Sequence, residues 1–335
     1  MKKERIAIAI GDPNGIGPEI AVKAAINFIG SDIQPVLVGD EQVLRHYVQQ
    51  HAARIPLWPL TEAGGTSNIG ESGRDWILYA PVASLPSDRF APGEVDAEAG
   101  RATVAYVREA VRLAQAGEVA AIVGCPHSET AVNSAGIPFS GYPGLIAQLT
   151  HTPQDQVFLM LAAAGLRIAH VTLHESVRDA LARLTVDLVV KAGVAAACAT
   201  RRLGVDNVRL AVFGINPHSG EDGLFGDDDE RITKPAVAQL RTLGIAADGP
   251  AGADLLLGQR RHDVYLAIFH DQGHIPVKLL SPLRASALTI GTEVLFSSVG
   301  HGSAFDIAGR GIADPVSVIE TVNLLRQAVQ RGSRT

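Results

Sequence analysis

The sequence predicts an α/β fold in which strands and helices alternate around a largely parallel sheet. Short apolar runs of strand length are separated by stretches with helical spacing along most of the chain. Hydrophobic residues make up 47% of the chain and aromatic residues only 5%, so Ala, Val, Leu and Ile must form most of the core. At 335 residues, the chain is long enough for two domains of ordinary size.

The N-terminal part begins with a strand that runs into the Gly-rich turn Gly11 to Glu19. Its glycines permit close approach of the backbone to a ligand, and Pro18 suits the first turn of a helix. A strand, a Gly-rich turn and a helix are typical of an anion-binding loop. The glycine spacing does not match a dinucleotide fingerprint, so an ordinary tight turn is an equal alternative. The elements expected in this part are strands at 6–10, 35–38 and 120–124 and helices at 20–28 and 102–114.

The C-terminal part continues the alternation. The paired runs after residue 156 predict two strands joined by a short turn, and Gly244 ends a later helix. The elements expected here are strands at 157–161, 166–172, 208–213, 264–269 and 289–299 and helices at 177–203, 231–243 and 315–329. No internal repeat is present.

Three of these strands each deliver a histidine just past their end: His174, His218 and His270. In an open α/β sheet, ligands bind outside the carboxyl ends of the strands. Imidazole is the commonest protein ligand for borderline divalent metals, and three protein ligands leave room for water or substrate. With Asp271 beside one of them, the set indicates a metal site. The alternative is three unrelated loop histidines.

A fourth strand end carries His127 and Ser128, which could contact substrate or could simply cap a loop. The neighbouring Cys125 is expected to be a small buried residue. With Cys198 it makes only two cysteines, which excludes a disulfide framework and a thiolate metal cluster.

Charge and hydropathy exclude other classes of protein. The net charge is −6 without a basic run, which argues against a nucleic-acid partner. No apolar stretch is long and clean enough to span a membrane, and residues 1–5 do not begin a signal peptide. We therefore expect a cytoplasmic protein that binds a small molecule.

Several motifs point to one family. They are residues 11–19, 135–139, 216–218, 270–273, 300–302 and 308–311. Together they span nearly the whole chain and resemble the family of 4-hydroxythreonine-4-phosphate dehydrogenases. The resemblance implies an isocitrate/isopropylmalate-dehydrogenase-like fold of two α/β/α domains with an interdomain cleft. We expect a discontinuous first domain, 1–127 plus 300–335, and a second domain, 128–299, with the metal ligands and dimer contacts. It also implies a homodimer with its active site near the subunit interface.

The resemblance also implies cofactors and site residues. A divalent metal would be held by three histidines that match His174, His218 and His270. Zinc is preferred, and nickel, cobalt, manganese or magnesium are alternatives. NAD is the expected oxidant. The remaining predicted roles are catalytic for Lys278, Asp271 and Asp254, cofactor-binding for Gly11, Asp12 and Gly291, and substrate-binding for His127, Ser128, Tyr142 and Phe296.

Departures from the family pattern bear on the substrate. Tyr142 and Pro143 stand where the phosphate-using relatives carry His-Thr, Ala287 replaces an Asn, and Phe296 replaces an Arg. Losing the Arg removes a bidentate anion clamp, and gaining the Phe adds an aromatic wall. A phosphate monoester then fits poorly, whereas a flat ring becomes plausible.

A narrower branch of the family matches better. Residues 124–131, 139–143, 170–178 and 271–276 are similar to the dehydrogenases of terephthalate cis-dihydrodiol. That activity is the NAD- and metal-dependent oxidative decarboxylation of 1,2-dihydroxy-3,5-cyclohexadiene-1,4-dicarboxylate to protocatechuate. The alternatives are the same chemistry on 4-hydroxythreonine 4-phosphate or a related four-carbon phosphorylated hydroxy acid, a metal-dependent hydrolase, and a non-enzymatic binding protein.

Overall fold

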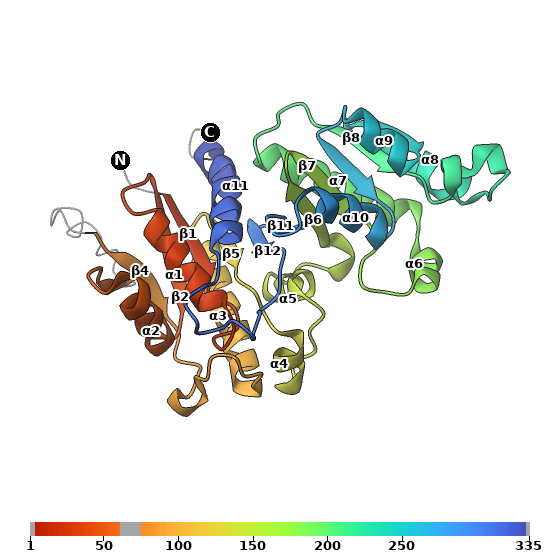
Figure 1. The fold of residues 1–335 in the computed structure, drawn as a ribbon. Coiled ribbons are helices and arrows are strands. Elements are labelled where there is room, and N and C mark those ends of the chain that lie inside the picture. The colour runs from red at the N-terminus through yellow and green to blue at the C-terminus, as the bar shows by residue number, and fades with distance from the viewer. Residues whose placement is uncertain (1–3, 61–74, 333–335) are drawn as a thin grey trace. The chain divides into compact units, whose positions relative to one another are not determined.

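The computed structural model describes residues 4–60 and 75–332 and divides into two compact units (Figure 1). Unit 1 comprises Met1–Gly141 and Val294–Gln330, and unit 2 comprises Tyr142–Glu293 and Arg331–Thr335. Residues 1–3, part of the stretch that argued against a signal peptide, lie outside the described residues. In the parts that the structure describes, no helix has the length and apolar character needed to cross a membrane.

Unit 1 is built on a parallel sheet with the strand order β3-β4-β2-β1-β5-β12. Helix α3 packs against β1, β2 and β5, and its N-terminus is capped by Asp96, which accepts hydrogen bonds from two backbone N–H groups of the first turn. The strands are β1 (Glu4–Ala9), β2 (Ile33–Gly39), β3 (Leu57–Pro59), β4 (Ile77–Pro81), β5 (Ala121–Gly124) and β12 (Phe296–Val299). The helices are α1 (Gly17–Asn27), α2 (Glu41–Ala52), α3 (Ala97–Gln115), α4 (Glu129–Ser134) and α11 (Val316–Gly332).

Unit 2 has a mixed sheet with the strand order β11-β6-β7-β10-β8-β9. Strands β7, β10, β8 and β9 are parallel, and β6 is antiparallel to both β7 and β11. The strands are β6 (Phe158–Ala163), β7 (Leu166–His170), β8 (Arg209–Phe213), β9 (Ala246–Ala251), β10 (Val264–Ala267) and β11 (Ser286–Ile290). The helices are α5 (Tyr142–Leu149), α6 (Val177–Arg183), α7 (Val186–Arg202), α8 (Lys234–Thr242), α9 (Ala253–Gln259) and α10 (His270–Leu280).

The α/β class is thus confirmed, and several boundaries need correction. The predicted helix 177–203 is two helices, because Thr185 caps a new helix by accepting a hydrogen bond from the Leu188 N–H group, 3.1 Å away. The predicted strand 289–299 is two strands, because the chain turns at Gly291 with a positive φ of 93°.

The boundaries of the two units also differ from those of the predicted domains. The prediction placed the boundaries between residues 127 and 128 and between residues 299 and 300. Helix α4 belongs to unit 1 because it packs against α3. Strand β12 belongs there as well because it pairs with β5, with Phe296 opposite Ile122. The unit boundaries therefore fall at Gly141 and Val294.

Candidate functional site

Three neighbouring strands of unit 2, β7, β10 and β8, run parallel, so their carboxyl ends meet at one edge of the sheet. His174 lies in the segment after β7, His270 is the first residue of α10 after β10, and His218 lies in the segment after β8. The predicted positions of the three histidines just past strand ends are confirmed.

Two side chains tie these strand ends together. Thr172 donates a hydrogen bond from Oγ1 to the carbonyl oxygen of Ile268, at 2.7 Å. Gln272 accepts hydrogen bonds at Oε1 from the N–H groups of Ile268 and Phe269, at 2.9 and 3.0 Å, and donates from Nε2 to the Gly214 carbonyl, at 2.9 Å. Buried or half-buried polar groups with all these bonds satisfied hold loops in one geometry. The edge of the sheet is therefore a rigid support.

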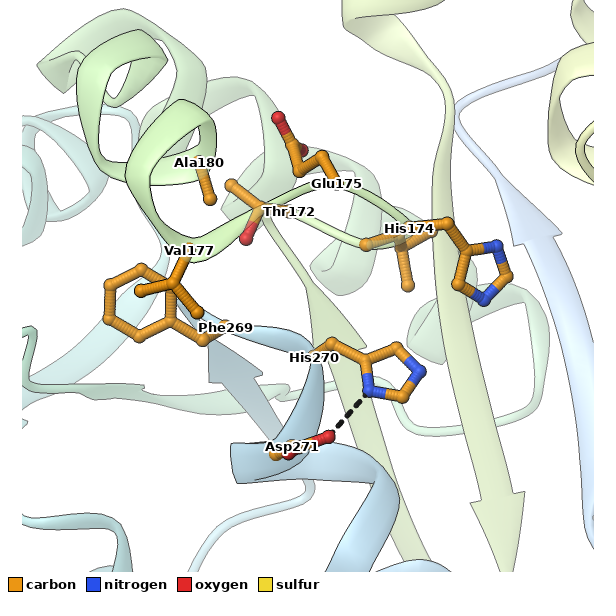
Figure 2. A pocket seen from close by; sticks show the side chains of 9 residues that line it. Thr172, His174, Glu175, Val177, Ala180, Phe269, His270 and Asp271 are labelled. Carbon is orange, nitrogen blue, oxygen red and sulfur yellow. Dashed lines mark hydrogen bonds and ion pairs between the residues drawn. The ribbon is translucent and has the colours of Figure 1, made fainter.

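A cavity of about 310 Å³ lies at this edge, between the segment after β7 and the start of α10. Figure 2 shows Phe269 and Val177 on the apolar side of the cavity, and the imidazoles of His174 and His270 with the carboxylate of Asp271 on its polar side; the carboxylate of Glu175 also belongs to the lining. The volume is within the range of small-molecule sites. Its lining residues all belong to unit 2: Thr172, Leu173, His174, Glu175, Val177, Ala180, Phe269, His270 and Asp271.

His174 and His270 both line this cavity, with their ring centroids 5.5 Å apart (Figure 2). Nδ1 of His270 lies 2.8 Å from Oδ1 of Asp271. A carboxylate that accepts the hydrogen of one ring nitrogen fixes the tautomer and leaves the other nitrogen, Nε2, to ligate a metal. The structure thus brings together two of the three predicted ligands and the predicted Asp271.

His218 is placed differently. Its side chain is 74% exposed, and its Nδ1 lies 2.8 Å from Oε2 of Glu221. Residues 218–222 all have positive φ, a conformation that costs free energy in L-residues. The buried carboxylate of Asp229 supports this loop by accepting hydrogen bonds from the N–H groups of Ile215 and Asn216, at 2.8 and 2.9 Å.

The implied divalent metal fits these residues by donor type. His270 and His218 both have Nδ1 against a carboxylate, the pattern found around ligating histidines. The geometry is less complete, because within residues 4–60 and 75–332 no three His, Cys, Asp or Glu side chains are gathered as a metal site. Two imidazoles converge in the cavity, and the third predicted ligand does not join them in this structure.

Two further histidines, His170 and His274, pack beside His270, and the predicted site did not include them. His170 is fully buried, and burial lowers its pKa to about 3. His274 lies one helical turn after His270, and burial followed by the nearby His270 lowers its pKa to about 4. Both rings are neutral at pH 7. The i, i+4 spacing of His270 and His274 was the available signal, since it places both on one face of α10.

Lys278 lies on the same face of α10, two helical turns after His270. Its side chain is half-buried, and burial lowers the pKa of its ammonium group. A helix therefore presents His270, His274 and Lys278 in one row. The predicted Asp254 is elsewhere: it is exposed in the first turn of α9 and does not line the cavity. A catalytic role for Asp254 stays a prediction.

The structure gives the predicted cofactor residues packing roles, and their contact with NAD stays a prediction. Gly11 and Asp12 are buried in unit 1. A Cβ on Gly11 would lie 2.1 Å from the Pro126 carbonyl oxygen, so packing of the chain on itself explains this glycine. Gly291 is exposed, but a Cβ there would lie 1.9 Å from the carbonyl oxygen of Gln156. The glycines serve turns and close packing, which the sequence pattern could not distinguish from ligand binding.

The predicted substrate residues also have structural roles. Ser128 caps α4 by accepting a hydrogen bond at Oγ from the Ala131 N–H group, at 3.1 Å. The ring of His127 packs edge-on against Phe139, with centroids 4.8 Å apart, and burial lowers its pKa to about 4. Tyr142 begins α5 and is 3% exposed. The caps and packing are the alternative already considered for His127 and Ser128.

Phe296 requires a correction. It lies in β12 and is fully buried, so its ring has no exposed face to offer as the wall of a substrate pocket. Because an Arg at this position would bury a charge, replacing Phe296 by Arg is expected to damage the fold as well as any binding. The buried Phe296 therefore gives no direct geometric reason to prefer a flat ring over a phosphate ester as the substrate.

The chain is similar to known proteins along almost its full length. A family model described as "Pyridoxal phosphate biosynthetic protein PdxA" matches residues 31–325. A 1,2-dihydroxy-3,5-cyclohexadiene-1,4-dicarboxylate dehydrogenase from a Comamonas species is 49% identical over 321 residues, which cover 96% of each chain. A 4-hydroxythreonine-4-phosphate dehydrogenase from Desulforapulum autotrophicum is 35% identical and covers 95% of this chain and 94% of its own.

The chain is also similar to a solved structure whose name refers to the same diol as the first of these relatives. The crystal structure of a terephthalate 1,2-cis-dihydrodiol dehydrogenase from Burkholderia xenovorans LB400 is 48% identical, covers 97% of this chain and 98% of its own, and has a TM-score of 0.73. The TM-score reports the superposed backbone. Substrate choice depends on side chains, so the identity is the more relevant number for function.

Proposed function

The chain belongs to the pyridoxal phosphate biosynthetic protein PdxA family, and from this membership we propose that it is a dehydrogenase of terephthalate cis-dihydrodiol. The observation that carries the substrate assignment is the 49% identity over 96% of the chain to a dehydrogenase named for that diol. The relative named for 4-hydroxythreonine 4-phosphate is 35% identical over a similar length, and that substrate is the second candidate.

The proposed reaction oxidises the C2 hydroxyl of 1,2-dihydroxy-3,5-cyclohexadiene-1,4-dicarboxylate to a ketone. The C1 carboxylate is then beta to this ketone and leaves as carbon dioxide. The electron pair of the broken C–C bond forms the enolate of the aromatic product, protocatechuate. One substrate dianion and one NAD⁺ thus give one protocatechuate anion, one carbon dioxide and one NADH, and the recovery of aromaticity makes the sequence hard to reverse.

The proposed reaction needs two cofactors, NAD and a divalent metal. NAD would accept the hydride, and a divalent metal at the histidines would act as a Lewis acid toward the diol oxygens. His174 and His270 would hold the metal from the cavity side, with His218 as the third ligand brought in from the segment after β8. Zinc suits this imidazole set, and nickel, cobalt or manganese are alternatives. Buried residues 11 and 12 give no reason to assign the NAD site to the Gly-rich turn.

The chain's own residues would orient the substrate and the ligands. Asp271 holds the hydrogen on Nδ1 of His270, at 2.8 Å, so that Nε2 faces the cavity as a lone-pair donor. Lys278, two turns further along α10, would pair its ammonium group with a substrate carboxylate or with the enolate oxygen. Phe269 and Val177 would cover the apolar ring. The isocitrate-dehydrogenase-like fold, the homodimer and the cytoplasmic location stay predictions.

The proposal is tested by the stoichiometry of the products. The purified full chain is incubated with the diol and NAD, and NADH, carbon dioxide and protocatechuate are measured separately. We expect equal amounts of all three, and loss of all three after treatment with a chelator. NADH without carbon dioxide would contradict the decarboxylation. Consumption of substrate without NAD would instead favour a metal-dependent hydrolase.

A further inference from the structure

His170 is a buried histidine whose tautomer is defined by its neighbours. Its ring lies in β7 with no exposed surface. Nδ1 lies 3.3 Å from the carbonyl oxygen of Leu159 on the adjacent strand β6. A carbonyl oxygen can only accept a hydrogen bond, so Nδ1 of His170 carries the hydrogen. Its Nε2 therefore has a lone pair that can accept a hydrogen bond.

His274 supplies that hydrogen bond. Its Nδ1 lies 3.1 Å from Nε2 of His170 and 3.3 Å from the carbonyl oxygen of His270. Both neighbours are acceptors, so Nδ1 of His274 carries a hydrogen shared between them. Two contacts from different elements thus set both the tautomer and the orientation of the His274 ring.

The fixed ring of His274 lies against His270. The two rings are stacked, with centroids 3.7 Å apart and an interplanar angle of 12°. At the edge of the ring, Nδ1 of His270 lies 2.8 Å from Oδ1 of Asp271. His270 is therefore held in two directions: by a carboxylate at Nδ1 and by a flat ring against its face.

Gly273 gives a separate indication that these contacts are built into the helix. A Cβ on this residue would lie 2.2 Å from Nε2 of His170. Its φ is not positive, so the backbone conformation does not require glycine there. The close approach of the His170 ring to α10 does require it. Glycine at this position lets a ring from β7 reach the side chain of the next residue, His274.

We propose that His170 and His274 are positioning residues that hold the imidazole of His270 in the orientation that ligates a divalent metal. This role rests on the proposed function, in which His270 is a metal ligand. Outer-shell partners of a ligating histidine typically change metal affinity by 10–100-fold when they are removed, and because His274 acts through the face of the ring we expect roughly the lower end of this range. The competing role for both histidines is core packing, which would affect folding but not metal affinity in the folded protein.

The first experiment reads the tautomer in the metal-free full chain, by NMR of ¹⁵N-labelled imidazoles. In the wild type, we expect His274 to be wholly in the Nδ1–H form. His170→Phe keeps a flat buried ring but removes the nearer of the two acceptors, so the Nδ1–H fraction of His274 should fall and give a mixture of tautomers, with only the His270 carbonyl oxygen still accepting. His170→Gln restores an acceptor and should return His274 to the Nδ1–H form. A mixture in the wild type, or no change in His170→Phe, would refute the arrangement.

The second experiment measures zinc affinity by titration calorimetry. His274→Leu removes the stacked ring at a half-buried position, and we expect zinc to bind roughly tenfold more weakly. Gly273→Ala should weaken binding in the same direction because its methyl group displaces His170. His262→Gln is the matched control: this histidine precedes β10, at the end of that strand opposite His270, and its substitution should leave affinity unchanged.

The outcomes separate this inference from the proposed function. Variants that remain folded by circular dichroism and bind zinc as the wild type does would overturn the positioning role. So would a wild type that binds no zinc, because His270 would then have no ligand role to support. If His170→Phe does not fold, His274→Leu decides. Weaker zinc binding in the variants, with a wild type that produces no NADH from the diol, would retain the positioning role and refute only the substrate.

Discussion

At the scale of single residues, Asp12 combines a place in the Gly-rich turn with complete burial of its side chain. Its carboxylate is fully buried, and Oδ1 accepts a hydrogen bond from the Asn14 N–H group, at 2.9 Å. Burial raises the pKa of Asp12 from 3.8 to about 6. The folded protein therefore binds this proton more tightly than the unfolded chain does, and the free energy of unfolding falls as pH rises through that window.

Asp12→Asn should remove this pH dependence. Above pH 6 the variant has no buried charge, so we expect it to be more stable than the wild type by on the order of 1–3 kcal/mol. Below pH 3.8, the ordinary value for an aspartate, this position is neutral in both the folded and the unfolded wild type, so the gain should disappear there. Urea unfolding at about pH 3 and about pH 7.5 measures both values. A variant that is less stable at the higher pH would show that the carboxylate makes favourable contacts when ionised.

The metal ligands give a second prediction at this scale. His270→Ala and His218→Ala should each lower turnover at least roughly a hundredfold, since loss of a ligand exceeds loss of its support. The side chains are 35% and 74% exposed, so the variants should keep the melting temperature of the metal-free wild type. Metal content by mass spectrometry should fall with activity. Full metal content and rate in His218→Ala would contradict a three-histidine site.

At the scale of elements, the segment after β8 depends on one buried carboxylate. Asp229 accepts hydrogen bonds from two backbone N–H groups at the end of β8 and from Oγ1 of Thr233, which is 2.6 Å away. These bonds fix the start of the loop in which residues 218–222 have positive φ. Nothing in the sequence pattern distinguishes Asp229 from the less buried acidic residues beside it, so the sequence carried no signal for its role.

Asp229→Ala should leave these buried donors unsatisfied and cost at least about 2 kcal/mol of unfolding free energy. It should also free the loop that carries His218, so zinc affinity in the folded fraction should fall. Asp227→Asn is the control, since its side chain is 69% exposed, and it should change neither value. Equal stability of Asp229→Ala and the wild type would show that the carboxylate does not organise this loop.

Sequence patterns predicted the elements and the strand ends because hydrophobic periodicity and strand-end chemistry are local properties. They placed His174 and His270 at the edge where the cavity lies. They missed His170 because it reads as one more residue of an apolar strand, and its contacts with His274 arise only when β7 and α10 pack together. Phe296 was misjudged for the same reason, since burial of a strand residue depends on its partners across the sheet.

At the scale of the whole molecule, family membership defines the reaction class, and identity ranks the substrates. The match to the diol dehydrogenase at 49% and to the phosphate-using dehydrogenase at 35% both extend over almost the full chain. The chain therefore has the whole scaffold of either enzyme, and its specificity must come from side chains that differ between them. Tyr142, Pro143 and Ala287 remain the positions where such differences were predicted.

The most direct test compares kcat/KM for terephthalate cis-dihydrodiol and for 4-hydroxythreonine 4-phosphate. Both are assayed by NADH formation with the same zinc-loaded preparation and repeated after chelation. We expect the diol to be preferred by at least roughly a hundredfold, equivalent to about 2.7 kcal/mol of transition-state binding, and both activities to vanish with chelator. A higher kcat/KM for the phosphate ester would contradict the proposed function.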